Sequence, residues 1–335
     1  MINTQCSVCG NNMNNKIYHV SEMMFGYGDI FTYFECSHCG CLQIFGIPSD
    51  ISKYYPPQYY SFSTKPSTSN SHRARLNKFL DTQRNRYAVF NHGLIGKILF
   101  NRSPDDRLRS LSKVSNLTKD SKILDVGCGS GLLLFTLKEL GFKNLLGIDK
   151  YIDHDFQYPN GLRIQKGTLQ EISGKWNLIM FHHSFEHMPE PLKTMLEASK
   201  LLTNGGTCLI NLPTVSSYAW KYYGVNWVQL DAPRYFFLHS VKSLNILGEK
   251  ANLTLQDVVY NSIAFQFWGS EQYLRNISLK SDRSYSKNPS NSIFTKDQIK
   301  AYEQKAKELN MQNLGDSAAF YFVKNNNHKT SYVNY

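Results

Sequence analysis

The chain has 335 residues, which is enough for one large domain and one or two small ones with an ample core. Its composition, 41% hydrophobic and 19% charged with a formal net charge of +11, is that of a soluble globular protein. No apolar run approaches the roughly 20 residues of a membrane-spanning helix, and the start MINTQCSVCG lacks the basic and apolar regions of a secretion signal. We therefore expect no membrane insertion and a cytoplasmic location.

The positive charge is concentrated in one connecting segment. Residues 65–122 contain 13 Lys or Arg and 4 Asp or Glu, and 13 − 4 leaves +9. Such a segment could meet RNA, an acidic membrane surface or a phosphorylated substrate. A solvated helix face explains the charges at least as well.

Four cysteines near the N-terminus are spaced for a metal site. Cys6 and Cys9 form one C-x-x-C pair, and Cys36 and Cys39 form a second. Two thiolates three residues apart can bind one metal from a tight turn, and two such turns complete a tetrahedral zinc site. Because no coordination position stays open, we expect a structural zinc. Residues 1–60 would then form a zinc-binding module whose stability depends on the metal, since so short a segment buries too little core to fold alone.

Residues 61–103 connect this module to the rest of the chain. The stretch YYPPQYYSF, at residues 54–62, overlaps the start of this connection. Its aromatic rings could pack in a core or form a wall that faces a substrate, and we favour packing. Residues 61–71 are rich in Ser, Thr and Pro, which is typical of a linker. From 72 to 100, apolar residues recur at intervals of mostly three and four, which predicts one or two basic amphipathic helices. These helices could cap the main domain or form contacts in a homodimer.

A glycine-rich stretch at 122–131, KILDVGCGSG, predicts a strand, a tight turn and a helix. The glycines stand at alternate positions and allow backbone angles that other residues avoid. The first amide groups of the following helix face the same spot, so a ligand can lie against bare main chain. Asp149 ends the next apolar run, 24 positions after Asp125, where a carboxylate can accept both ribose hydroxyls of a nucleoside.

The spacing of the glycines discriminates between ligands. A dinucleotide fingerprint needs a glycine at 132, but Leu132 stands there and the glycine is at 131. The pattern D-x-G-x-G-x-G resembles motif I of class I S-adenosylmethionine-dependent methyltransferases, and the resemblance covers most of residues 104–327. It implies a set of residues that hold S-adenosylmethionine: Asp125, Gly127, Cys128, Gly129, Gly131, Asp149 and His182.

The predicted elements of residues 104–327 alternate between strands and helices. This order predicts an α/β fold, a doubly wound, Rossmann-like methyltransferase sheet with helices on both faces. The resemblance implies that the last strand is an antiparallel edge strand; residues 261–316 then form a helical insertion before it, and residues 328–335 a tail. The predicted strands are 122–126, 145–149, 162–165, 176–181, 206–212, 253–260 and 318–324, and the predicted helices are 132–140, 191–202 and 241–251.

A histidine-rich turn, HHSFEHMP at 182–189, follows the predicted strand at 176–181. It resembles motif IV of the family, an apolar strand followed by H-x-x-E-H. Methyl transfer is an in-line displacement at a sulfonium, so the enzyme mainly positions the acceptor and removes its proton, a task that suits histidine at neutral pH. We predict His187 as the general base, with His183 and Glu186 as alternatives. This turn could instead only brace the cofactor loop.

A second segment points to the acceptor. The stretch LDAPRYFFLHS at 230–240 resembles the D-x-P-R-H segment of bacterial methyltransferases from polysaccharide and antibiotic-sugar gene clusters, which often carry a similar zinc module. Tyr235 replaces the usual histidine. The planar fork of Arg234, with Asp231 and Tyr235 beside it, could bind a phosphate or carboxylate of the acceptor. An internal ion pair between Asp231 and Arg234 that stabilises the loop is an equal alternative.

The resemblance implies a methyltransferase that acts on a small polar acceptor, a nucleotide-linked or polysaccharide sugar, at oxygen or carbon. An rRNA or tRNA methyltransferase is the alternative, since four-cysteine modules also precede this fold in some rRNA-modifying enzymes. No [D/N]-P-P-[Y/F] follows the strand at 176–181, however, so nucleic acid is the less favoured partner. A non-catalytic binding protein of the same fold is a third hypothesis.

Overall fold

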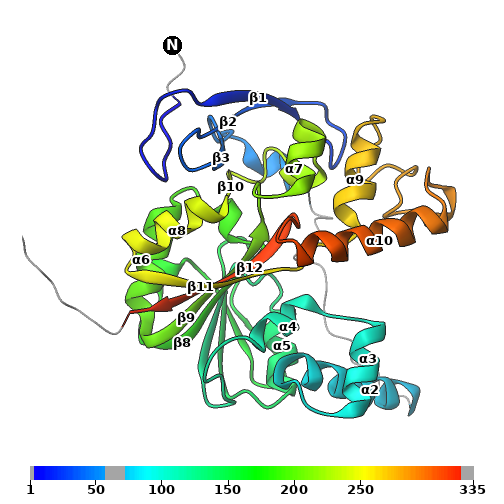
Figure 1. The fold of residues 1–335 in the computed structure, drawn as a ribbon. Coiled ribbons are helices and arrows are strands. Elements are labelled where there is room, and N and C mark those ends of the chain that lie inside the picture. The colour runs from blue at the N-terminus through cyan, green and yellow to red at the C-terminus, as the bar shows by residue number, and fades with distance from the viewer. Residues whose placement is uncertain (1–3, 57–71, 326–335) are drawn as a thin grey trace, which may run out of the picture.

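The computed structural model describes residues 4–56 and 72–325 (Figure 1). A large mixed sheet forms its centre, with helices on both faces and a smaller sheet over one end. The predicted linker at 61–71 and the tail at 328–335 lie outside the described residues, as does most of the aromatic stretch at 54–62.

The large sheet has eight strands in the order β11-β12-β9-β8-β4-β5-β7-β6. The run from β9 to β7 is parallel, and β12 is antiparallel to both of its neighbours. This is the doubly wound methyltransferase sheet that the sequence predicts. Its strands are β4 (Lys122–Val126), β5 (Asn144–Asp149), β6 (Phe156–Gln157), β7 (Arg163–Lys166), β8 (Trp176–His182), β9 (Leu202–Pro213), β11 (Leu253–Tyr260) and β12 (Ser317–Lys324).

The prediction that the last strand lies at the edge is wrong. β12 pairs with β9 on one side and with β11 on the other, so β11 is the edge strand. The burial of the two strands explains this order. Nearly all of β12 is buried, whereas β11 has buried, half-buried and exposed residues. A strand that buries both faces needs neighbours on both sides.

Two hydrophobic cores lie on the two faces of this sheet, and β12 contributes to both. Phe320 and Phe322 pack into the core beneath α6 and α8, and Tyr321 packs into the core beneath α4 and α5. Successive side chains of a strand point to opposite faces, so one strand supports both layers. The helices are α2 (His72–Phe90), α3 (Leu94–Arg102), α4 (Asp106–Leu111), α5 (Leu132–Glu139), α6 (Pro191–Leu201), α7 (Tyr218–Tyr223), α8 (Val241–Lys250), α9 (Phe265–Tyr273) and α10 (Lys296–Met311).

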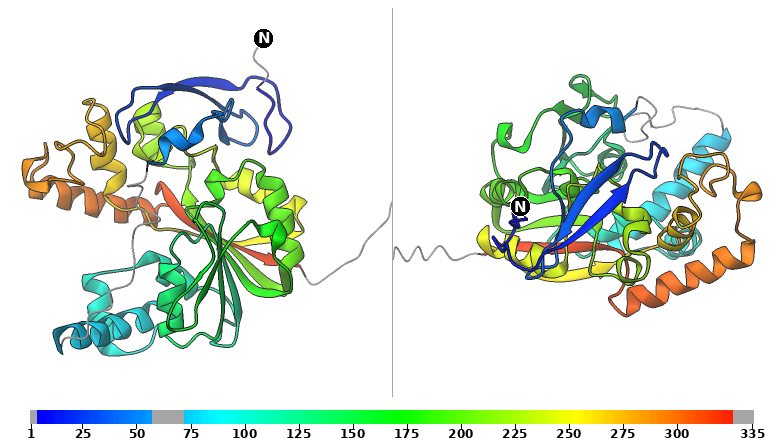
Figure 2. Two further views of the ribbon diagram at one scale, coloured as in Figure 1. Left: turned by 180° about the vertical axis from the view of Figure 1, so that it is seen from behind. Right: turned by 90° about the horizontal axis from the view of Figure 1, so that it is seen from above.

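The N-terminal sheet is completed by a strand from the large domain. Its order is β1-β2-β3-β10, in which β10 (Phe237–Leu238) pairs with β3 (Leu42–Ile44). The two remaining strands are β1 (Lys16–Ser21) and β2 (Ile30–Glu35). Figure 2 shows this sheet, in blue, seated over one end of the molecule. The predicted module therefore shares both a sheet and a hydrophobic core with the domain below it.

Short 3-10 helices and a helical insertion complete the fold. The insertion contains α9 and α10, as expected for residues 261–316, and the turns between them include η6. Among the described residues, no helix combines the length and apolar character that a bilayer crossing requires. The 3-10 helices are η1 (Ile51–Tyr54), η2 (Leu169–Glu171), η3 (Phe185–His187), η4 (Gly224–Asn226), η5 (Val228–Leu230) and η6 (Pro289–Asn291).

Candidate active site and metal centre

A cavity of about 680 Å³ lies at the carboxyl ends of the parallel strands. This is the edge of a doubly wound sheet at which ligands bind. The glycine turn after β4, Asp149 at the end of β5 and the histidine turn after β8 all line it. Residues far apart in the sequence thus meet at one place, as the motifs predict.

The glycine turn has the strained backbone that its glycines allow. Gly127 has φ +72° and Gly131 has φ +74°, both in the left-handed region. A Cβ at 127 would lie 2.5 Å from the Cβ of Ser184, so the histidine turn packs directly on the glycine turn. Ser184 also donates a hydrogen bond to the Val126 carbonyl at 2.6 Å. Position 127 therefore requires glycine, because its φ is positive and because a side chain there would collide with Ser184.

Asp149 is oriented by the main chain around it. Its Oδ2 accepts a hydrogen bond from the Gly129 amide at 2.9 Å, and its Oδ1 accepts one from the Tyr151 amide at 2.8 Å. The side chain lines the cavity. Each carboxylate oxygen can accept more than one hydrogen bond, so both retain capacity toward a ligand.

Asp125 lies beneath the same turn and is only 3% exposed. Its Oδ1 has no hydrogen-bond partner among the described residues, although the side chain lines the cavity. Burial raises the pKa of Asp125 to about 7, Arg107 partly offsets the rise, and Asp149 adds to it. A cationic ligand group beside Asp125 would satisfy this oxygen and stabilise the charged form.

Burial of Asp125 gives a testable pH dependence of stability. The folded pKa of about 7 lies above the unfolded value of about 3.9, so the group's contribution to stability is fully present below pH ~4 and is lost as pH rises through 7. We expect Asp125→Asn to remove this loss, which amounts to up to about 4 kcal/mol. Urea unfolding of both proteins at pH 5 and pH 8 measures about 3 kcal/mol of this loss, because part of it has already occurred at pH 5. The exposed control Asp153→Asn should behave as wild type, and identical pH profiles for wild type and Asp125→Asn would contradict the assignment.

The histidines of the turn after β8 have different surroundings. His182 is enclosed, neither ring nitrogen has a hydrogen-bond partner among the described residues, and burial, with His183 adding to it, lowers its pKa to about 3. His187 Nδ1 lies 2.8 Å from the Arg234 carbonyl oxygen, which can only accept, so Nδ1 carries the proton and Nε2 the lone pair of the neutral ring. Tyr55 Oη lies 3.1 Å from the same nitrogen. All three histidines line the cavity, so each can reach a ligand.

Glu186, the third candidate base, does not line the cavity. It is fully buried, and its carboxylate has no hydrogen-bond partner among the described residues. Its Oε1 lies 3.6 Å from His183 Nδ1. A group that cannot touch the reacting atoms can act only through its neighbour, here the His183 ring.

Arg234 and Asp231 form the internal ion pair rather than an acceptor site. Arg234 is fully buried and outside the lining of the cavity. Its guanidinium donates to both oxygens of Asp231 at 3.0 Å, to Glu22 Oε1 at 2.8 Å and to the Tyr54 carbonyl at 3.3 Å. The prediction that Arg234 binds an acceptor phosphate is thus corrected, because its guanidinium is already hydrogen-bonded to other groups of the protein. Tyr235 differs from its neighbours and does line the cavity.

The sequence reasoning missed several lining residues. Arg107, in the first turn of α4, and Tyr151, after β5, border the cavity, as do Ile47 and Ile51 of the N-terminal segment. Arg107 is one of thirteen basic residues in its segment, so nothing local distinguished it. Tyr55 also borders the cavity, whereas Tyr54 is buried against Phe31. In the described part of the aromatic stretch, Tyr54 therefore serves packing and Tyr55 the cavity wall.

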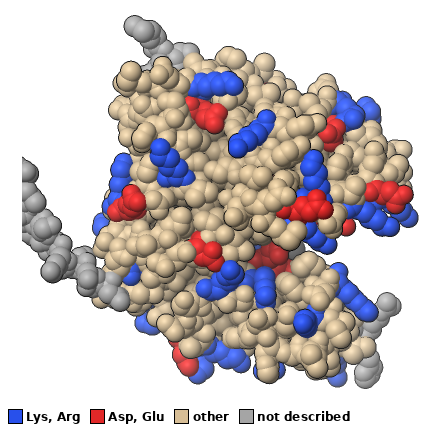
Figure 3. Space-filling model, viewed as in Figure 1, with Lys and Arg blue, Asp and Glu red and all other residues tan. Residues whose placement is uncertain are grey.

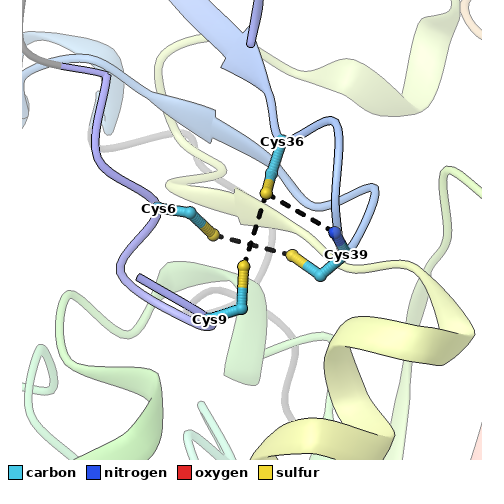
Figure 4. A group of neighbouring side chains, drawn as sticks. All are labelled: Cys6, Cys9, Cys36 and Cys39. Carbon is cyan, nitrogen blue, oxygen red and sulfur yellow. Dashed lines mark hydrogen bonds between the residues drawn. The ribbon is translucent and has the colours of Figure 1, made fainter. Parts of the chain in front are cut away.

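The four predicted metal ligands converge at the N-terminal sheet. Figure 4 shows their sulfur atoms pointing toward one another. All four lie within 4.8 Å of each other, with Cys6 Sγ 3.6 Å from Cys39 Sγ and Cys9 Sγ 3.4 Å from Cys36 Sγ. A tetrahedral zinc with bonds of about 2.3 Å separates its sulfurs by ~3.8 Å, so the donor set fits this ion.

Hydrogen bonds around the cluster favour thiolates. Gln43 Nε2 donates to Cys6 Sγ at 3.0 Å, and the Cys39 amide approaches Cys36 Sγ at 3.5 Å. Cys41 is buried but lies outside the cluster, with its Sγ 3.8 Å from His239 Nδ1. Thiolates held by such donors are the state that binds a metal.

Comparison with known proteins agrees with this geometry. Residues 96–258 match the family model described as a methyltransferase domain. The predicted fold class is confirmed: the chain carries a Rossmann-like α/β domain, and it matches a methyltransferase domain.

Curated relatives resemble the same part of the chain at low identity. The ubiquinone biosynthesis O-methyltransferase of Psychrobacter arcticus is 24% identical over 169 residues, 44% of this chain and 65% of that protein. The tRNA U34 carboxymethyltransferase of Campylobacter fetus is 24% identical over 151 residues, 42% and 54% respectively. The chain thus spans less than two thirds of either relative, and neither is named as a sugar methyltransferase.

Solved methyltransferase structures are also among the similar proteins. The magnesium protoporphyrin IX methyltransferase of Synechocystis, with bound SAH, is 11% identical and has a TM-score of 0.40 over 74% of this chain and 94% of that chain.

Proposed function

We propose that this protein transfers a methyl group from S-adenosylmethionine to a small polar acceptor. The observation that carries the proposal is the single cavity where the glycine turn, Asp125, Asp149 and the histidine turn meet. Asp149 would accept the ribose hydroxyls, and the orphaned Oδ1 of Asp125 would accept from the ammonium group of the donor.

For methyl transfer, the protein needs mainly to position the donor and the acceptor and to provide one group that accepts a proton. The acceptor atom forms a bond to the methyl carbon while the carbon–sulfur bond breaks, and the electron pair of that bond stays on sulfur. The acceptor's proton passes to a histidine of the turn, His183 or His187, whose neutral ring offers a free nitrogen. A sugar remains our proposed acceptor, with oxygen or carbon as the methylated atom, and the cysteine cluster supplies a structural zinc.

Loss of the ribose carboxylate tests the proposal. Asp149→Ala should weaken the binding of S-adenosylhomocysteine by more than about a hundredfold, because hydrogen bonds to a charged group contribute about 1.5–3 kcal/mol each. Calorimetry measures the dissociation constants, and circular dichroism checks that the variant is folded. The exposed neighbour Asp153→Ala is the matched control and should bind as wild type. Equal affinities for all three proteins would refute the placement of the donor.

A tRNA acceptor is the second candidate. Lys and Arg side chains gather over the lower helices in Figure 3, and Arg75, Lys97 and Arg102 of α2 and α3 are exposed. The relative from Campylobacter fetus is a tRNA-modifying enzyme by name. A gel shift of tRNA that weakens steeply between 50 and 200 mM salt would favour this candidate over a sugar.

A further inference from the structure

A second cavity, of about 430 Å³, adjoins the first. It lies where α4 begins, where β9 ends and where the helical insertion starts, and Figure 3 shows the molecule notched between the insertion and the lower helices. The volume falls within the roughly 300–1,000 Å³ of small-molecule sites. Arg107 and His183 line both cavities, so the two meet at these residues.

Side-chain amides form one wall of the second cavity. Asn261 Nδ2 donates to Asn211 Oδ1 at 3.2 Å, but Asn261 Oδ1 is buried and has no hydrogen-bond partner among the described residues. The side-chain amide of Gln229 donates a hydrogen bond to Asp316 Oδ2 at 3.0 Å, which fixes the orientation of the amide. A buried carbonyl without a donor destabilises the protein, and a hydrogen bond from a ligand hydroxyl would offset this cost.

The opposite wall is acidic. Asp105 and Asp106 stand at the start of α4, and both line the cavity. Arg107 pairs with Asp105 at 3.4 Å, so its charge is partly compensated there. Carboxylates and amide oxygens accept hydrogen bonds, which favours a neutral ligand rich in hydroxyl groups and disfavours a phosphate or carboxylate.

His183 stands at the junction in an unusual conformation. Its φ of +51° is in the left-handed region, and its amide donates to the Asn211 carbonyl at 2.8 Å. The buried Glu186 carboxylate faces its Nδ1 at 3.6 Å. Left-handed backbone is unfavourable in a residue other than glycine and persists where the surroundings hold it, often at functional sites. His187 and His182 reach the first cavity alone.

We infer that the second cavity is the acceptor site, that it takes a neutral, hydroxyl-rich molecule, and that His183 is the histidine which this molecule meets. The inference rests on the proposed function, since the first cavity must hold the methyl donor. It assigns the helical insertion a role as the outer wall of the acceptor site.

Nuclear magnetic resonance of the full chain with S-adenosylhomocysteine tests this inference. The probes are glucose, N-acetylglucosamine, glucose 6-phosphate and glucuronate. In saturation-transfer spectra, we expect signals from the two neutral sugars and weaker ones from the two anions. Asn261→Leu, which has a similar volume, should reduce neutral-sugar affinity by about tenfold, the effect of one lost hydrogen bond. Asn245→Leu, on α8 and outside the lining of both cavities, is the control and should keep it.

A second readout locates the sugar. With isotope-labelled histidine, the ring resonance of His183, assigned through His183→Asn, should shift on addition of glucose, and that of the buried His239 should not. Preferred binding of the anions, equal sugar binding by wild type and Asn261→Leu, or an unmoved His183 resonance would each overturn the inference. If S-adenosylhomocysteine itself fails to bind wild type, the proposed function fails instead.

Discussion

Replacing Cys36 with serine should abolish zinc binding and unfold the N-terminal sheet. Cys9 and Cys36 bring their sulfurs to 3.4 Å, and Cys6 and Cys39 bring theirs to 3.6 Å, so the cluster is built for a shared ion. In zinc-finger peptides a structural zinc contributes about 10–16 kcal/mol, and we expect the same coupling of metal binding to folding here. We expect the unfolding midpoint to fall by more than about 10 °C. Calorimetry and metal analysis by mass spectrometry measure both effects.

The fifth cysteine of the same sheet provides the control. Cys41 is fully buried in the same core but lies outside the cluster. Cys41→Ala should retain the zinc content of wild type and lose only about 1–2 kcal/mol of packing. Zinc retained in Cys36→Ser, or lost in Cys41→Ala, would show that these four residues do not form the metal site.

Replacing Arg234 with methionine should lower the free energy of unfolding by about 3–5 kcal/mol. The side chain is fully buried, and its guanidinium satisfies Asp231, Glu22 and the Tyr54 carbonyl at once. Without it, two buried carboxylates lose their counter-ion, which is far more costly than losing a surface pair. Urea unfolding monitored by tryptophan fluorescence measures the change.

An exposed arginine provides the comparison. Arg275, just after the end of α9, pairs with Glu271 at 2.7 Å, but its side chain is 53% exposed. Arg275→Met should cost no more than about 0.5 kcal/mol, because solvent screens the pair. Similar losses in the two variants would mean that the buried cluster does not stabilise the fold as its geometry indicates.

Arg234 also connects the N-terminal sheet to the candidate active site. Its guanidinium binds Glu22, which follows β1, and its carbonyl accepts from His187. The Tyr33 hydroxyl donates to the Tyr235 carbonyl at 2.8 Å, beside the same segment. The N-terminal sheet, which carries the four-cysteine cluster, therefore supports the wall of the cavity.

Local sequence was sufficient to predict most of the large domain. The predicted strands at 122–126 and 253–260 match β4 and β11 at both ends, because β-branched and other apolar residues are concentrated there between turn residues. The glycine turn and the four cysteines were also predictable, since their spacing carries the geometry. The position of β12 was not, because pairing with two antiparallel neighbours depends on strands far away in the chain.

The segment predicted to bind the acceptor also separates what local sequence predicts from what it does not. Asp231 and Arg234 are three residues apart, and from sequence a ligand site and an internal pair were equally consistent. Glu22, 212 residues from Arg234, decides between them, because its carboxylate completes the buried cluster. Likewise, Asn211 and Asn261 meet only when β9 and the insertion are folded together.

The amino-acid sequence by itself determined the class of domain, the glycine turn and the four-cysteine cluster of this protein, because each is marked by short motifs with a fixed spacing. Only the tertiary structure decided which polar residues face a cavity and which neutralise one another in the interior. Burial and pairing of charges depend on contacts between distant segments, and no local pattern encodes them.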